Sequence, residues 1–433
     1  MKRILFVAAV AALAASCAGG PKPVDRPQWF TNENYFEEKN GMYEEMPVFP
    51  ANIVMVGDDY VDRGVWSEFF GDTTLKNRGI TYDATEHVLY RIDRIAAGKP
   101  AKIFVSAGWN DVLHGTPKET VVGNIDAIFS RIHKCSPRTA CYWLNIVGTS
   151  DMTGEQKEAV AYINTQVQAR AAKSGFEVVD IAAALRENID NGTYSWDGGK
   201  LLNGAGYEAF AQAIETQVGK PHLNRAADRT YPLEVSDYYR HRVSVFRSLP
   251  ETDRRIVMLG NSLNNNALWS ELFPMGYIVN RGISGDVIDG VAQRLDEIVP
   301  DAPVKIFLMT GANDLVNDPE LSVVDAWARY EKLIKAITEQ LPNTVLYVQS
   351  ILPVNPKSSF YEGFNARAAE INKLLDAAKE RYNYMYIDVA SKLSDENGDL
   401  MDACTTDGLH LSATGYFLWA AELAKVPRML VQF

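Results

Sequence analysis

The chain has 433 residues, of which 47% are apolar and 23% charged, a composition typical of a globular protein with material for more than one core. Its formal net charge of −12 argues against a nucleic-acid partner, because phosphates select basic surfaces. The same acidity argues against attachment to an anionic membrane through charge.

The first residues are typical of an export signal. Lys2 and Arg3 precede an apolar run at residues 4–15, which is too short to span a bilayer core that needs roughly 20 residues. Small residues then lead into Cys17, a pattern that resembles a bacterial lipoprotein signal. We therefore predict a signal peptide at residues 1–17 and a lipid on Cys17. This lipid would be the protein's one attachment to a membrane, at a periplasmic or cell-surface location. A plain secretory signal is the alternative.

One segment of the sequence occurs twice. "IVMVGDDYVDRGVWSEFF" from Ile53 returns as "IVMLGNSLNNNALWSELF" from Ile256, at an offset of 203. The same offset relates "NRGITYD" to "NRGISGD" and "KIFVSAGWND" to "KIFLMTGAND". A period of this length indicates a duplicated domain rather than a solenoid repeat.

We therefore predict two domains of one fold that pack against each other. Their predicted limits are a linker at 18–30, a first domain at 31–218, a linker at 219–230 and a second domain at 231–433.

Strand-like and helix-like segments alternate within each copy. In the second copy the predicted strands are short β-branched runs, and two long amphipathic helices lie between them. The strands are expected at residues 255–259, 305–309, 345–352 and 384–389, and the helices at residues 324–340 and 360–381. Alternation of this kind predicts an α/β fold with a parallel sheet covered by helices on both faces. In such sheets, ligands bind beyond the carboxyl ends of the strands.

The cysteines leave one structural question open. Cys135 and Cys141 flank a short Ser-Pro loop and could form a disulfide in an oxidising compartment, whereas Cys404 is expected to be free. The chain has no Cys-x-x-Cys pair and its six histidines are scattered, so we predict no metal site.

Four motifs of the second copy carry residues suited to acyl transfer. Ser262, in "GNSL", follows the first predicted strand at a tight turn, where a hydroxyl lies beside helix N–H groups. Asp407 and His410, in "DGLH", could supply a base and a carboxylate that orients it. Gly285 and Asn313, in "NRGISGD" and "GAND", could donate hydrogen bonds to a developing oxyanion.

Together these motifs resemble the SGNH hydrolases, also called the GDSL esterase and lipase family, and the group similar to platelet-activating-factor acetylhydrolase subunits. The resemblance covers residues 231–430. It implies two tandem three-layer α/β/α domains of flavodoxin-like architecture, each with a parallel sheet of about five strands. It departs from the family's motif at Asn261, where the family has Asp.

The resemblance also implies the roles of the site residues. Ser262 would be the nucleophile, His410 its base and Asp407 the group that orients His410. The oxyanion hole would be formed by the backbone N–H groups of Ser262 and Gly285 and by the Asn313 side chain. The reaction would be ester hydrolysis through an acyl-serine, without metal or cofactor.

The first copy is expected to be inactive. The offset places Asp59 at the nucleophile position and Tyr82 at the Gly285 position, where we expect it to remove an oxyanion donor and to fill the acyl space. Asn110 and Asp197 remain, but Lys200 or Leu201 replaces His410. This copy is expected to be a structural partner or a binding module. Acid–base chemistry or Ca²⁺ binding at Asp58 and Asp59 is the alternative.

For the whole protein, the expected substrate is a small ester or an acetylated glycan, with short O-acetyl esters on carbohydrates favoured. The polar run Asn264 to Asn266 beside Ser262 suits a sugar better than a lipid tail. The alternatives are a lipase or thioesterase for longer acyl chains and a non-catalytic glycan-binding lipoprotein.

Overall fold

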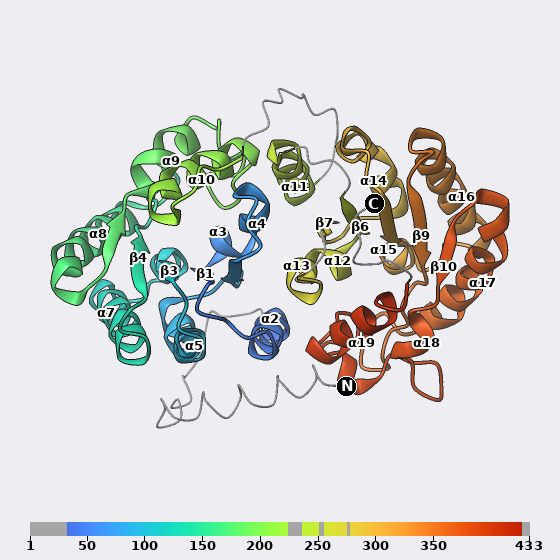
Figure 1. The fold of residues 1–433 in the computed structure, drawn as a ribbon, viewed down its shortest axis with the longest axis horizontal. Coiled ribbons are helices and arrows are strands. Elements are labelled where there is room, and N and C mark those ends of the chain that lie inside the picture. Colours follow the sequence, from blue (N-terminus) through green and yellow to red (C-terminus); the bar gives the residue numbers. More distant parts are fainter. Residues whose placement is uncertain (1–32, 224–235, 251–254, 275–277, 427–433) are drawn as a thin grey trace. The chain divides into compact units, whose positions relative to one another are not determined.

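The computed structural model describes residues 33–223, 236–250, 255–274 and 278–426. The chain divides into two compact units, residues 1–250 and residues 251–433. Over the described residues, each unit contains one five-stranded sheet with helices on both of its faces (Figure 1). The predicted signal peptide and Cys17 lie outside the described residues.

The sheet of the first unit has the strand order β2-β1-β3-β4-β5, and all neighbouring strands are parallel. Its strands are β1 (Ile53–Gly57), β2 (Leu75–Gly79), β3 (Lys102–Ser106), β4 (Ala140–Leu144) and β5 (Glu177–Val179). Its helices are α2 (Glu33–Glu45), α3 (Asp59–Asp62), α4 (Trp66–Phe69), α5 (Thr85–Ala97), α6 (Trp109–Leu113), α7 (Lys118–Cys135), α8 (Gly154–Ser174), α9 (Ile181–Asp190), α10 (Gly204–Val218) and α11 (Asp237–Ser248).

The second unit repeats this topology, with the parallel order β7-β6-β8-β9-β10. Its strands are β6 (Ile256–Gly260), β7 (Ile278–Gly282), β8 (Lys305–Met309), β9 (Val345–Gln349) and β10 (Met385–Ile387). Its helices are α12 (Ser262–Asn266), α13 (Trp269–Leu272), α14 (Ile288–Gln293), η1 (Leu295–Glu297), η2 (Val299–Asp301), α15 (Ala312–Asn317), α16 (Val323–Gln340), α17 (Phe364–Tyr382), α18 (Ala390–Leu393), η3 (Asp402–Cys404) and α19 (Ala413–Leu423).

Both faces of each sheet are apolar, as expected for parallel strands between helix layers. In β3, Ile103 and Val105 join the core beneath α5, α7 and α8, whereas Phe104 stacks on Tyr142 with ring centroids 4.6 Å apart. In the second unit Phe307 makes the same stack with Tyr347, at 4.5 Å. The predicted α/β fold, with parallel sheets of about five strands, is confirmed.

Element boundaries differ from expectation by a few residues. The strand expected at 345–352 ends at Gln349, because the chain leaves the sheet there to form the loop beyond its carboxyl end. The helix expected from residue 360 begins at Phe364, after Gly363 at a φ of +69°.

One helix groups with the first unit although its sequence repeats α2 and the predicted second domain began at residue 231. The helix α11 packs against α10, where the Gly204 N–H donates to Ser244 Oγ at 2.6 Å. A side chain at Gly204 would lie 2.3 Å from the Ser244 carbonyl oxygen, so the glycine permits this contact. The Arg242 guanidinium also donates to the Arg63 carbonyl at 2.8 Å.

Cys135, Cys141 and Cys404 are buried thiols, and the disulfide considered between Cys135 and Cys141 is not formed. Burial raises the pKa of the Cys141 thiol to about 12, so it stays protonated at neutral pH. No helix among the described residues combines the length and the apolar character that crossing a membrane requires.

A testable consequence concerns Gly57, at the end of β1. A Cβ there would lie 1.8 Å from the Ser106 carbonyl oxygen. We therefore expect Gly57→Ala to lower the free energy of unfolding of the first unit by about 3 kcal/mol, measured by urea denaturation. The control is Gly123→Ala on α7, where an added Cβ meets nothing within 4 Å. This control should change stability by at most about 1 kcal/mol, and an equal loss in both variants would contradict the argument.

Candidate active site

The nucleophile candidate lies at the carboxyl end of the central strand β6. Ser262 is the first residue of α12, directly after the turn formed by Gly260 and Asn261. The Asn261 side chain accepts a hydrogen bond from the Leu263 N–H at 3.2 Å and so caps this short helix. Asn at this position therefore keeps the capping contact that shapes the turn.

Asp407, His410 and Ser262 form a continuous hydrogen-bonded chain. His410 Nε2 lies 3.2 Å from Ser262 Oγ, and His410 Nδ1 lies 2.7 Å from Asp407 Oδ2. The other Asp407 oxygen accepts the N–H groups of Leu409 and His410, at 2.8 and 2.7 Å. The structure thus brings together three residues that are 148 positions apart at most, in the geometry of a nucleophile, its base and the group that orients the base.

The electrostatics of Asp407 suit this arrangement. Partial burial alone would raise its pKa, but the hydrogen bond and the charge of His410, with two backbone N–H groups, hold the pKa well below its usual range. Asp407 is therefore ionised at neutral pH and stabilises a protonated His410.

The predicted oxyanion donors follow the neighbouring strands. Gly285 is exposed and has a φ of +81°, a backbone region that favours glycine. Asn313 lies in α15 after β8, and its Nδ2 donates to the Asp286 carbonyl at 2.8 Å, which fixes the orientation of the amide. One further amide hydrogen of Asn313 is not used in that bond and can point to a substrate oxygen.

Comparison with known proteins places both copies in one family. A sequence model of the GDSL-like lipase/acylhydrolase family matches residues 57–209 and again residues 259–418. The chain belongs to this family. The two matched segments are the two copies of the duplication.

Individual relatives resemble parts of the chain. Platelet-activating factor acetylhydrolase IB subunit alpha1 of Rattus norvegicus is 28% identical over 130 residues, covering 29% of this chain and 54% of that protein. The chain thus spans about half the length of the curated relatives it matches. A solved structure described as a platelet activating factor from Streptococcus pneumonia is 30% identical and covers 43% of this chain and 87% of its own, with a TM-score of 0.38. A GDSL-like lipase from Bacteroides thetaiotaomicron is 18% identical, with coverages of 43% and 95% and a TM-score of 0.39.

The first GDSL copy keeps the groups that correspond to the predicted oxyanion donors, and the side chain of its own Asp59 accepts their hydrogen bonds. Asp59 stands where the second copy has Ser262, and its Oδ2 accepts the Tyr82 N–H and the Asn110 side chain, each at 2.9 Å. Its other oxygen lies 3.3 Å from the Arg63 guanidinium. One carboxylate oxygen therefore fills the position that these donors would offer to an oxyanion.

One expectation about Tyr82 needs correction, and the other stays a prediction. The predicted loss of a donor there is wrong, because the donor is a backbone N–H and Tyr82 keeps the positive φ of the turn, at +66°. We also expected the Tyr82 ring to fill the acyl space, and this side chain is 46% exposed. Such filling is not needed to block the site, because Asp59 already accepts the hydrogen bonds of the donors.

The structure also shows which residue of the first copy corresponds to His410. The Leu201 N–H donates to Asp197 Oδ1 at 3.0 Å, as the His410 N–H does to Asp407 in the second copy. Leu201, rather than Lys200, therefore takes the place of His410 in the chain. The imidazole of His241 in α11 lies near the same carboxylate, with its Nε2 3.9 Å from Asp197 Oδ1. Asp58 and Asp59 belong to no group of three possible metal ligands among the described residues, which leaves the Ca²⁺ alternative without support.

The argument that the polar run beside Ser262 faces a sugar also fails at Asn264. Asn264 is fully buried, and its Nδ2 donates to the carbonyl groups of Leu259 and Met309, at 3.2 and 3.5 Å. The sequence could not show this direction, because a polar side chain that binds the strand ends looks the same as one that faces a ligand.

Sequence reasoning missed a buried ion pair that joins the nucleophile strand to the oxyanion loop. Arg294 Nε lies 2.9 Å from Asp286 Oδ2, and Arg294 Nη2 donates to the Gly260 carbonyl at 3.0 Å. The carbonyl of the same Asp286 holds Asn313. Burial raises the pKa of Asp286 to about 6, against the opposing charge of Arg294. The sequence did contain a sign of this pair, because both residues recur in the first copy as Arg91 and Asp83.

We expect Arg294→Met to reduce kcat/KM for p-nitrophenyl acetate about 10²-fold, because Gly285 and Asn313 lose their alignment to the nucleophile. Arg294→Lys, which keeps the charge, should recover part of the rate. The matched control is Arg91→Met, which removes the same pair from the first copy, where Arg91 lies 2.6 Å from Asp83.

Arg91→Met should leave kcat/KM within about twofold, although breaking a buried pair destabilises its own unit by about 3 kcal/mol or more. Thermal unfolding of each variant separates misalignment from loss of fold. Equal losses of activity in Arg294→Met and Arg91→Met would contradict a positioning role for Arg294.

A second prediction concerns Asp59. Asp59→Ser restores a hydroxyl to the first copy but no base, since Leu201 replaces the histidine. In a Ser262→Ala background, Asp59→Ser should therefore give no esterase activity above that background. Hydrolysis of p-nitrophenyl acetate by the double variant would show that the first copy retains a base elsewhere.

Proposed function

We propose that the second copy is a serine esterase that cleaves short acyl esters, chiefly O-acetyl esters of carbohydrates, through an acyl-serine intermediate. The observation that carries the proposal is the 3.2 Å approach of His410 Nε2 to Ser262 Oγ, with Asp407 behind the imidazole. An alcohol is a weak nucleophile at neutral pH and needs such a base.

The proposed steps use groups of this chain alone. Ser262 Oγ attacks the ester carbonyl carbon while its proton passes to His410 Nε2. The resulting oxyanion accepts hydrogen bonds from the N–H groups of Ser262 and Gly285 and from Asn313. The intermediate collapses as His410 protonates the leaving alcohol. A water molecule, deprotonated by His410, then attacks the acyl-serine and releases the carboxylic acid.

The first copy supports the proposed oxyanion hole. There the N–H at the Gly285 position and the amide at the Asn313 position converge on one oxygen of Asp59, each at 2.9 Å. Because the two copies share this backbone, the same donors can hold one oxygen in the second copy. The donors lie at the distance at which a transition-state oxyanion is stabilised.

Two considerations support the proposed substrate class. The matched relatives are named acetylhydrolases, which favours a short acyl group. The carbohydrate part rests on the predicted export and lipid anchor, which would place the enzyme where extracellular glycans are met. We likewise propose, from the sequence pattern at Cys17, that the protein is a lipoprotein.

The test is a series of p-nitrophenyl esters from acetyl to decanoyl, run beside release of acetate from acetylated xylo-oligosaccharides. We expect kcat/KM to be highest for acetyl and to fall with chain length. Ser262→Ala should lower kcat by more than about 10³-fold, because it removes the nucleophile. Asp59→Ala, at the equivalent position of the first copy, is the matched control and should leave kcat/KM within about twofold.

Activity that rises with chain length would instead favour a lipase or thioesterase. If the intact protein cleaves no ester, or if Ser262→Ala keeps its activity, the esterase proposal is wrong.

A further inference from the structure

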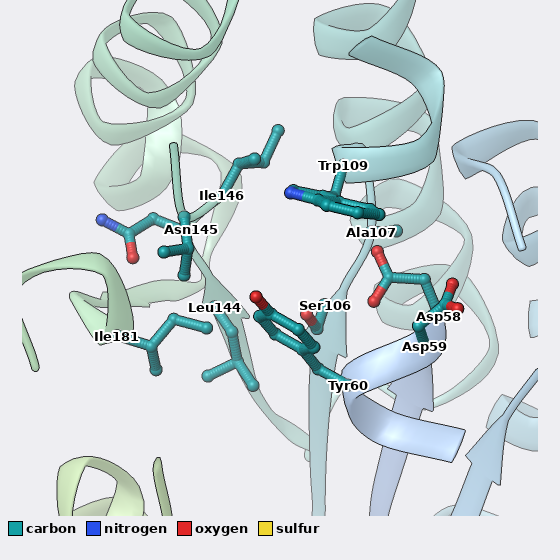
Figure 2. A pocket seen from close by; sticks show the side chains of 11 residues that line it. Asp58, Asp59, Tyr60, Ser106, Ala107, Trp109, Leu144, Asn145, Ile146 and Ile181 are labelled. Atoms are coloured by element: carbon teal, nitrogen blue, oxygen red, sulfur yellow. The ribbon is translucent and has the colours of Figure 1, made fainter. Parts of the chain in front are cut away.

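A pocket lies at the carboxyl ends of β1, β3 and β4 in the first unit, beside Asp59 (Figure 2). Its empty space is about 310 Å³ when the open mouth is included, and its enclosed part has room for about one water-sized group. The rings of Tyr60 and Trp109 flank it, with centroids 6.3 Å apart and planes inclined by 30°. Most of the remaining wall is aliphatic, formed by Leu144, Ile146, Val147 and Ile181.

This lining differs from that of the second copy at the residues that face the pocket. Tyr60 replaces Leu263, Ser106 replaces Met309 and Trp109 replaces Ala312, each at the offset of 203. The copy without the catalytic residues has therefore exchanged three aliphatic side chains for two aromatic rings and a hydroxyl. Aromatic rings beside hydrogen-bonding groups are a common way to hold a small, partly polar ligand.

The pocket is lined by one buried hydrogen-bond donor without a partner among the described residues. Trp109 Nε1 is buried and has no hydrogen-bond partner in the described part of the chain, and in Figure 2 it points toward Ile146 and Asn145. Asn145 itself is engaged, because its amide donates to Asp180 at 2.7 Å and accepts the Ala182 N–H at 2.9 Å. A buried donor without an acceptor is energetically unfavourable, and a ligand acceptor would relieve that cost.

Asp58 adds a second polar group at the other end of the pocket. Its side chain lines the pocket and is 4% exposed. Burial raises the pKa of Asp58 well above its usual range, and the neighbouring Asp59 carboxylate raises it further. The raised pKa favours the protonated form of Asp58, which can donate a hydrogen bond, and the nearby charge of Asp59 disfavours an anionic ligand.

We propose that the first copy binds the acetyl group of an acetylated sugar. The acetyl methyl contacts Leu144 and Ile146, and its carbonyl oxygen accepts the Trp109 indole N–H. The sugar lies at the open mouth of the pocket. The inference deepens the proposed function and rests on its substrate class, since the silent copy would then hold the kind of glycan that the active copy deacetylates. No bond is cleaved in the first copy.

The test uses the full chain carrying Ser262→Ala, so that esters are not consumed. Isothermal titration compares N-acetylglucosamine with glucose, and O-acetylated xylobiose with xylobiose. We expect an acetylated sugar to bind at least about tenfold more tightly than its partner. Trp109→Phe keeps an aromatic wall and removes the N–H, and should weaken that binding about tenfold, which corresponds to about 1.4 kcal/mol.

Trp143→Phe is the matched control. Trp143 in β4 is fully buried, its Nε1 also has no partner among the described residues, and it does not line the pocket. This variant should bind acetylated sugars as the parent does, with thermal unfolding used to check that both variants are folded. Equal binding of acetylated and non-acetylated sugars, no binding of either, or full binding by Trp109→Phe would each overturn the inference.

The two proposals fail separately. An active esterase whose first copy does not bind acetylated sugars overturns the inference about the pocket and leaves the esterase proposal intact. If the chain with Ser262 in place hydrolyses no ester but still binds acetylated sugars in preference, the esterase proposal is wrong and the inference about the pocket stands.

Discussion

The buried pair of Arg294 and Asp286 is the interaction on which the geometry of the site depends. Arg294 is 1% exposed and Asp286 4%, so both groups have lost most of their hydration. A buried pair is tolerated only when further hydrogen bonds satisfy its remaining donors and acceptors. Here the guanidinium also binds the Gly260 carbonyl, at the end of the nucleophile strand. The pair therefore fixes the distance between the strand that carries Ser262 and the loop that carries the oxyanion donors.

The same constraint explains how the first copy lost its chemistry without losing its fold. Arg91 and Asp83 keep the pair, so the backbone of the oxyanion loop stays in place and its donors still converge. Donors left empty in a buried site carry a free-energy cost unless water or a side chain satisfies them. Asp59 supplies an acceptor at the position where a substrate oxygen would lie. Replacement of the nucleophile by a carboxylate thus stabilises the turn while it blocks the hole.

Much of this was predictable from the sequence, because the repeat supplies an internal comparison. The constant offset revealed the duplicated domain and the turn that carries Ser262, whereas Asp407 and His410 were found from their own motif in the second copy. The direction of a side chain was not predictable: Asn264 binds strand carbonyls and Trp109 leaves its N–H unpartnered, yet neither choice is visible in the residue type. The retained N–H donor at Tyr82 was not predictable either, because the backbone there keeps a positive φ that a tyrosine seldom adopts.

The grouping of α11 with the first unit changes what the duplication means for the chain. By sequence, this helix is the repeat of α2 and opens the second copy. By packing, Ser244 binds the first turn of α10 and Arg242 binds the loop after α3, so the helix completes the first unit. A chain divided at the sequence repeat, before residue 231, would remove a layer of packing from the first copy. The packing of the first unit therefore includes residues that the sequence repeat assigns to the second copy.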